Sequence, residues 1–199
     1  AAYHGRPAET VPLIAANADD ALARGEGLGL QHANWACAVL NNGLGRYPDA
    51  LAAAEQAAEE DYAPFITACA LPELVEAAVR SGQPGVATDA LTRLSKRTGT
   101  GVKGSDWAAG MWARSSALLS EGEIAESGYV EAIDRLARTP LRPDLARAHL
   151  LYGEWLRRQA RRVDARHQLR AAYDLFAAMG AQAFAERARA ELQATGSEA

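Results

Sequence analysis

The stretch Leu44–Leu51 reads LGRYPDAL, and it has the form of a tight turn between two helices. Gly45 is expected to end the first helix. Pro48 and Asp49 suit the first turn of the next helix, because proline loses no hydrogen bond there and an acid faces the positive end of the helix dipole. The stretch therefore predicts a helical hairpin.

Similar turns recur along the chain. They read SGQPGVATDAL at Ser81–Leu91, EGEIAES at Glu121–Ser127 and QARRVDA at Gln159–Ala165. When the turn residues Gly45, Gly82, Gly122 and Ala160 are aligned, successive turns lie 37, 40 and 38 residues apart. Repeats of this period are typical of stacked helix-turn-helix hairpins. The sequence therefore predicts an all-α protein, an α-solenoid in which antiparallel helix pairs form a right-handed superhelix.

Apolar residues at helical spacing predict about ten helices. The expected ranges are 10–24, 28–43, 48–60, 64–80, 84–97, 106–120, 124–138, 143–158, 162–179 and 181–194. Four repeats result, at 28–60, 64–97, 106–138 and 143–179, with helix 10–24 before them and helix 181–194 as a C-terminal cap. The glycine-rich stretch 98–106 is expected to be a loop. Residues 1–199 are expected to form a single domain.

Helices joined by a tight turn need small residues where they cross. Seven positions before each turn residue stand Ala38, Ser115 and Gly153, with Val75 as the exception. Five positions after it stand Ala50, Ala87, Ser127 and Ala165. The agreement predicts close crossings at these positions.

Composition favours the same fold and narrows the class of protein. Hydrophobic residues make up 49% of the chain, yet the mean hydropathy is −0.20, because alanine counts as apolar without adding much hydrophobicity. The net charge of −4 argues against a globally basic nucleic-acid binder. The two cysteines, Cys37 and Cys69, match no metal or redox spacing and fit buried thiols in a reducing cytoplasm. The chain begins without Met and is expected to be a piece of a longer cytoplasmic protein.

The segment Gly45–Leu51 resembles the tetratricopeptide repeat (TPR), whose first helix ends with Gly-x-Tyr and whose second helix has an early Ala. The other repeats depart from this pattern, since Pro84, Ile124 and Arg162 replace Tyr47. A degenerate, TPR-like array is therefore expected.

The whole chain resembles the helical sensor region of large actinobacterial LuxR-family regulators. The resemblance is carried by HGRPAETVPL, GEGLGL, ALPELVEAAVRSG, RSSALLSEGEIAE and, most specifically, the segment from ARAHLLYGEWLRRQ to AERARAEL. It implies a transcriptional regulator in which an ATP-binding STAND-type NTPase module precedes this region and a DNA-reading helix-turn-helix follows it. The neighbouring NTPase and helix-turn-helix domains are then partners of the chain, and DNA is bound only through the helix-turn-helix.

Three motifs with a catalytic appearance are expected to be structural. Gly25–Leu30 (GEGLGL) lacks the strand that a dinucleotide loop follows, and in Gly99–Ser105 (GTGVKGS) the lysine precedes the glycine, contrary to a Walker motif. The acids Glu59, Glu60 and Asp61 fit a solvated helix end. The histidines His4, His32, His149 and His167 show no metal-binding spacing. We therefore expect no enzyme, no metal and no cofactor.

The stretch Gly153–Leu169 (GEWLRRQARRVDARHQL) concentrates arginine at 157, 158, 161, 162 and 166. Such density can mark a nucleic-acid surface. A solvated face, on which the side-chain stems cover apolar surface, is the favoured interpretation. Docking to a neighbouring domain and direct DNA contact remain as alternatives.

The concave groove of the superhelix is the expected binding site, because first helices of such pairs line it. Carrying over the TPR groove pattern gives eight candidate residues, Trp35, Asn42, Glu76, Arg80, Trp112, Ser116, Glu154 and Arg157. Two aromatic side chains beside polar groups suit a small polar ligand or a peptide. The alternative is that Trp35 and Trp112 pack between repeats.

The resulting functional hypothesis is a sensing and coupling segment that binds a small-molecule effector or a protein partner. The alternative is an interaction scaffold that holds a peptide or helix in its groove. No membrane association is expected, and a homo-oligomer is left open.

Overall fold

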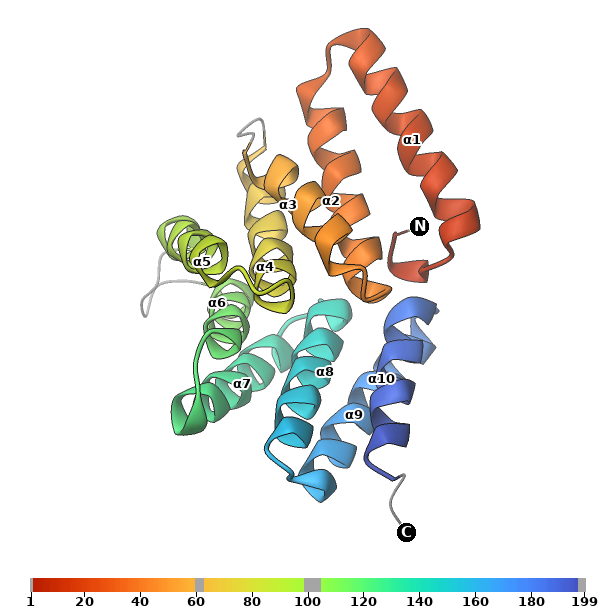
Figure 1. The fold of residues 1–199 in the computed structure, drawn as a ribbon. Coiled ribbons are helices and arrows are strands. Elements are labelled where there is room, and N and C mark those ends of the chain that lie inside the picture. The colour runs from red at the N-terminus through yellow and green to blue at the C-terminus, as the bar shows by residue number, and fades with distance from the viewer. Residues whose placement is uncertain (1, 60–62, 99–104, 197–199) are drawn as a thin grey trace. The chain divides into compact units, whose positions relative to one another are not determined.

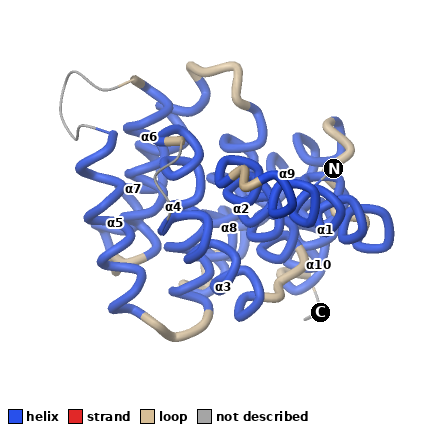
Figure 2. Tube along the Cα trace, turned by 90° about the horizontal axis from the view of Figure 1, so that it is seen from above, coloured by secondary structure: helices blue, strands red, loops and turns tan. Residues whose placement is uncertain are grey.

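The computed structural model describes residues 2–59, 63–98 and 105–196. These contain a short 3₁₀-helix, η1 (Ala2–His4), and ten α-helices: α1 (Pro7–Arg24), α2 (Gly27–Gly43), α3 (Tyr47–Glu59), α4 (Pro64–Arg80), α5 (Pro84–Thr98), α6 (Asp106–Leu118), α7 (Gly122–Ala137), α8 (Arg142–Arg158), α9 (Arg162–Ala178) and α10 (Gln182–Ala194). The all-α prediction and the ten predicted helices are confirmed. The described ranges contain no strand (Figure 2). Most of the loop predicted at 98–106 lies outside the described residues.

The chain divides into two compact units, unit 1 (Ala1–Thr98) and unit 2 (Gly99–Ala199). Unit 1 contains α1 to α5 and unit 2 contains α6 to α10. Within each unit, consecutive helices pack as antiparallel neighbours (Figure 1). In unit 1, α2 also contacts α4. The single domain expected from the sequence stays a prediction.

Five of the connections between helices use one and the same turn. After α1, α2, α4, α8 and α9, a residue with positive φ is followed by a backbone N–H that bonds the carbonyl five residues back, at 2.8–3.0 Å. These bonds are Glu26→Ala21, Arg46→Asn41, Gln83→Ala78, Arg161→Leu156 and Ala181→Phe176. This is the Schellman motif, which satisfies carbonyls left open at a helix end. Short turns of this kind fold each helix back along the preceding one.

The turn residue is glycine in four of these five connections, and Ala160 in the fifth. Ala160 has φ of 60°, in the left-handed region that glycine occupies without steric cost. An alanine held there loses stability because its Cβ approaches the following carbonyl oxygen.

The α6–α7 connection differs from the other hairpin turns. Leu119 and Ser120 bond carbonyls three residues back, and the left-handed Gly122 lies at the first residue of α7 rather than directly after α6. The register of α7 is therefore shifted. In α7, Ala125 is fully buried and Gly128 lies close to Ala113 and Ala117 of α6, whereas the predicted Ser127 is exposed. The prediction for Ser127 is wrong because it assumed an identical turn.

The other predicted crossing positions are confirmed as buried. Ala38, Ala50, Ala87, Ser115 and Ala165 are each 0% exposed. Gly153 of α8 also meets α9 closely: a Cβ added to Gly153 would lie 2.6 Å from Leu169 Cγ and 3.2 Å from the Leu169 nitrogen. Real Cβ atoms do not approach this closely, so only glycine fits the crossing.

The core of unit 1 contains a buried amide, Gln31 of α2, which is 1% exposed. Its Nε2 donates to the carbonyl of Ala57 in α3 and to Thr67 Oγ1 in α4, both at 3.0 Å. Its Oε1 accepts the backbone N–H of Ala63, the residue that precedes α4, at 3.1 Å. A buried amide with these partners joins three helices at one point.

The core of unit 2 is built on aromatic side chains. The rings of Tyr129 in α7 and of Tyr152 and Trp155 in α8 lie 5.5–6.1 Å apart between centroids. Phe176 of α9 stacks on Phe184 of α10 at 5.1 Å. These are favourable separations for aromatic pairs, and they join the consecutive helices α7 to α10.

We expect Gly153→Ala to lower the free energy of unfolding by about 1–3 kcal/mol, because overpacking at a tight crossing forces the helices apart. Chemical denaturation measures the change. Gly85→Ala is the matched control, since a Cβ at Gly85 meets nothing within 4 Å. Equal stability of the two variants would contradict the close α8–α9 crossing.

We expect Ala160→Gly to raise the free energy of unfolding by about 1 kcal/mol, because glycine removes the steric cost of the left-handed turn. The neighbouring Gln159→Gly is the control, since Gln159 has φ of −82° and gains nothing from glycine. Urea denaturation of both variants checks the prediction, and it fails if Ala160→Gly is the less stable of the two.

Candidate functional site

The structure places two of the four predicted groove residues of unit 1 inside the core. Asn42 of α2 is 0% exposed and donates from Nδ2 to Glu73 Oε2 of α4 at 2.7 Å. Glu76 of α4 is 1% exposed. Both side chains therefore take part in the packing of unit 1, and neither presents a free surface to a ligand.

The other two predicted groove residues of unit 1, Trp35 and Arg80, are half-buried. The indole N–H of Trp35 is buried and has no hydrogen-bond acceptor among the described residues. Trp35 is thus a half-buried ring whose indole N–H has no acceptor in the described part of unit 1.

In unit 2, the structure brings Trp112 and Ser116 of α6 together in a hollow of about 440 Å³ between α6 and α7. Glu123, Ile124 and Glu131 of α7 form its other side. Trp112 also packs against the buried cluster that includes Met111, Leu136 and Leu145. The ring of Trp112 therefore lines a hollow and packs on a buried cluster, and its place in a concave groove stays a prediction.

The remaining predicted pair, Glu154 and Arg157 of α8, holds α8 to α10. Glu154 is 3% exposed and forms two hydrogen bonds with the Arg187 guanidinium, at 2.6 and 2.9 Å. Arg157 pairs with Glu191 of α10. A bidentate pair fixes geometry as well as charge. These two residues therefore stabilise unit 2 by pairing with α10. The TPR groove pattern, which predicts that they face a ligand, gives no sign of these contacts.

Three arginines of the stretch Gly153–Leu169 bind their own chain. Besides Arg157, Arg161 contacts Glu126 of α7 at 2.6 Å. Arg166 of α9 donates to the Thr195 carbonyl at 2.7 Å. These contacts show that Arg157, Arg161 and Arg166 pair within the chain, and the solvated-face interpretation stays a prediction beside docking and DNA contact. Arg158 and Arg162 are exposed.

The pKa values of Glu126 and Tyr152 are both shifted in this part of unit 2. Hydrogen bonds from Arg161 and then from Tyr152 lower the pKa of Glu126. Burial, followed by the hydrogen bond to Glu126 at 2.9 Å, raises the pKa of Tyr152 to about 12. The Glu126 carboxylate therefore stays ionised at neutral pH and remains ion-paired with Arg161 of the same unit.

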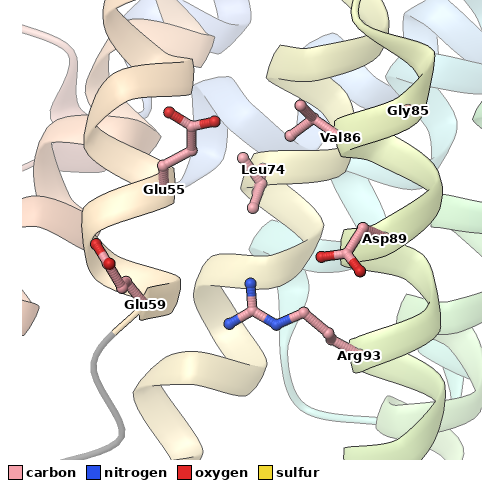
Figure 3. Close-up of a pocket in the computed structure, with 7 residues that line it drawn as sticks. All are labelled: Glu55, Glu59, Leu74, Gly85, Val86, Asp89 and Arg93. Carbon is pink, nitrogen blue, oxygen red and sulfur yellow. The ribbon is translucent and has the colours of Figure 1, made fainter.

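A second hollow lies in unit 1, between α3 and α5 with α4 beneath, and has a volume of about 800 Å³. We call it the α3–α5 hollow. Figure 3 shows Glu55 and Glu59 on α3 and, across the hollow on α5, Asp89 and Arg93, which extend toward α3. Its remaining lining residues are Leu74, Gly85 and Val86.

The charges of the α3–α5 hollow are unbalanced. Within the described residues, the carboxylates of Glu55, Glu59 and Asp89 take part in no ion pair or hydrogen bond. Arg93 instead donates to the carbonyl of Ala58 near the end of α3. Glu55 and Glu59 are one helical turn apart, so their charges repel by about 0.2–0.5 kcal/mol. The lining thus carries three negative charges against the single positive charge of Arg93, and its net charge is negative.

Sequence reasoning missed most of this hollow. Of its charged residues, only Glu59 is named from the sequence, as part of the acidic run with Glu60 and Asp61, two residues that lie outside the described ranges. One signal was present: Glu55 and Glu59 are the only charged residues on the alanine-rich α3 after Asp49, and they share one helix face.

Other features of the described part bear on the kind of site. No three or more His, Cys, Asp or Glu side chains there come close enough together to hold a metal ion. None of the helices in the described ranges has the length and apolar character needed to cross a membrane.

Comparisons with protein-family models, with curated proteins and with solved structures found no match to this chain.

We expect the stability of unit 2 to fall between about pH 7 and pH 5 through His149. Burial lowers the pKa of His149 below its ordinary value of 6.5, although its Nδ1 lies 2.7 Å from Gln168 Oε1. The unfolded chain therefore takes up the proton first, so this contribution is present above pH 6.5 and is lost as the pH falls below it.

His149→Gln should flatten this part of the pH profile, measured by urea denaturation at several pH values. His4→Gln, a substitution at an exposed residue in the other unit, is the control. Identical profiles of the two variants would contradict a role for His149.

Proposed function

We propose that this chain is a TPR-like, right-handed stack of helical hairpins that functions by binding a partner. The observation that carries the proposal is the recurrence of one Schellman turn after α1, α2, α4, α8 and α9. Fully buried alanines at the crossings, such as Ala50 and Ala165, bring the paired helices close together. Stacked helix pairs expose extended surfaces, and binding along such surfaces is the common function of this architecture.

The chemistry of the hollows favours a peptide or helix over a small effector. Small-molecule sites are mostly apolar and enclose most of their ligand. The α3–α5 hollow is lined by four charged residues and three uncharged ones. The hollow beside Trp112 also carries two glutamates, Glu123 and Glu131. Charged, open surfaces of this kind suit an extended partner whose own charges face them.

We place this binding role in a LuxR-family transcriptional regulator, as its sensing and coupling segment in the cytoplasm. The support is the resemblance of the chain to the helical sensor region of that family. Binding would regulate transcription by biasing NTPase and helix-turn-helix modules outside this chain. Such a bias requires a partner that binds two states of the parent protein with different affinities.

Selection of a library of short displayed peptides on the chain tests the binding role. We expect binders whose synthetic forms raise the melting temperature with concentration, because a ligand of the folded state stabilises it by RT ln(1 + [L]/Kd). A metabolite screen by the same thermal assay runs beside it. Stabilisation by a metabolite without peptide binders would favour the small-effector alternative, and no stabilisation by either would refute the binding proposal.

The regulator context has a separate test, the coding sequence on both sides of this region. A STAND-type NTPase module before it and a helix-turn-helix after it are expected. Their absence would remove the regulator context and leave the binding role to be decided by the peptide selection.

A further inference from the structure

The α3–α5 hollow has acidic side chains on two opposite sides, where a cation could bind. Glu55 and Glu59 project from α3 on one side and Asp89 from α5 on the other (Figure 3). None of the three carboxylates has a partner in the described part of the chain. The one cation of the lining, Arg93, is engaged by the Ala58 carbonyl. A cationic group from outside would therefore meet three acceptors that have no competing internal partner.

The hollow also has apolar surface and room for a side chain. Leu74 of α4 is 3% exposed and lies between the two walls, and Val86 stands beside it on α5 (Figure 3). Gly85 adds no side chain, and a Cβ there would meet nothing within 4 Å. Arginine and lysine carry an aliphatic stem below the charged group, and such stems lie on apolar surface while the charge reaches polar groups. The hollow matches that two-part chemistry.

A metal ion fits this hollow less well than a side chain does. Ca²⁺ and Mg²⁺ need several oxygen ligands within about 2.0–2.6 Å of one point. The carboxylates of Glu55, Glu59 and Asp89 belong to no group in the described residues that is close enough to act as such a ligand set. A guanidinium group has several N–H donors spread over a planar fork, so it can contact carboxylates that stand too far apart to ligate one metal ion.

The charge of unit 1 acts in the same direction over a longer range. Residues 1–98 contain 12 Asp and Glu against 7 Lys and Arg, whereas residues 99–199 contain 13 against 14. The negative charge of the chain thus resides in the half that contains the hollow. A net field of one sign steers an oppositely charged partner toward the surface that carries it.

We propose that the α3–α5 hollow binds a basic peptide segment of a partner protein. An arginine or lysine of that segment lies between Glu55 and Glu59 on one side and Asp89 on the other, with its stem over Leu74 and Val86. This inference rests on the proposed binding function and names its partner by chemistry, a segment rich in Arg and Lys. It also identifies a binding surface separate from the groove residues expected from the sequence.

The test uses fluorescent peptides and the full chain. The probes are a short Arg- and Lys-rich peptide and a second peptide of equal length with glutamine at each basic position, measured by fluorescence anisotropy at about 50 mM and about 300 mM salt. We expect the basic peptide to bind, its affinity to fall with salt, and the glutamine peptide not to bind. Spermidine, added as a competitor, distinguishes a peptide from a small polycation.

Neutral variants locate the binding site. The triple variant Glu55→Gln, Glu59→Gln and Asp89→Asn should weaken binding about tenfold, because each exposed charge pair contributes modestly. The matched control removes three exposed acids of α1, with Glu9→Gln, Asp19→Asn and Asp20→Asn. Circular dichroism melting of both variants shows that each is folded, and the control should bind the basic peptide nearly as well as the original chain.

The remaining outcomes of these binding experiments each contradict one part of the proposal. Equal losses in the two triple variants would show non-specific attraction to an acidic surface, and displacement of the peptide by low concentrations of spermidine would assign the hollow to polyamines. If library-selected peptides bind equally well to the original chain and to the triple variant of Glu55, Glu59 and Asp89, this inference is refuted. The proposed binding function would still stand. Failure of every peptide to bind would refute both.

Discussion

The structure depends on one backbone arrangement, a left-handed residue after a helix followed by an N–H that bonds the carbonyl five residues back. This arrangement reverses the chain within a few residues, so the next helix has to run back along the previous one. Antiparallel neighbours then follow with no long connection, and their side chains meet along the whole length of each pair. Small residues at the crossings, such as Gly153 against Leu169, are the consequence, because two helices joined so closely cannot accommodate bulk between them.

The fold could be predicted because its determinants are local in sequence. Glycine or alanine in the turn, proline and acid in the next helical turn, and alanine at the crossing each leave a visible mark. The prediction failed at Ser127, where a glycine of matching spacing, Gly122, begins α7 and does not close α6. The same residue type serves two different roles there, and only the hydrogen-bond pattern distinguishes them. Ala125 is fully buried and Gly128 lies close to α6, whereas Ser127, which the spacing assigns to the crossing, is exposed.

The candidate site was harder to predict because it depends on contacts between distant residues. Asn42 and Glu76 belong to a helix face that lines a groove in the TPR pattern, yet here both are buried. Glu154 looked like a ligand-binding acid and is instead held by Arg187, 33 residues away. The α3–α5 hollow is invisible to sequence patterns, since it exists only because α3 and α5 both pack on α4 and leave space between them. Glu55 and Glu59, isolated acids on the alanine-rich α3, are the local sequence signal for this hollow.

The amide of Gln31 has a consequence for how unit 1 responds to an event at its surface. Apolar contacts allow helices to slide or rotate by small steps, because each contact is exchanged for a similar one. Gln31 makes directional bonds to Ala57, Ala63 and Thr67 at once, so a turn of α2 about its axis would break all three together. Helices α2, α3 and the start of α4 are thereby coupled into a single mechanical element. A displacement of one of them would strain the bonds of Gln31 to the other two, so these segments are expected to move together.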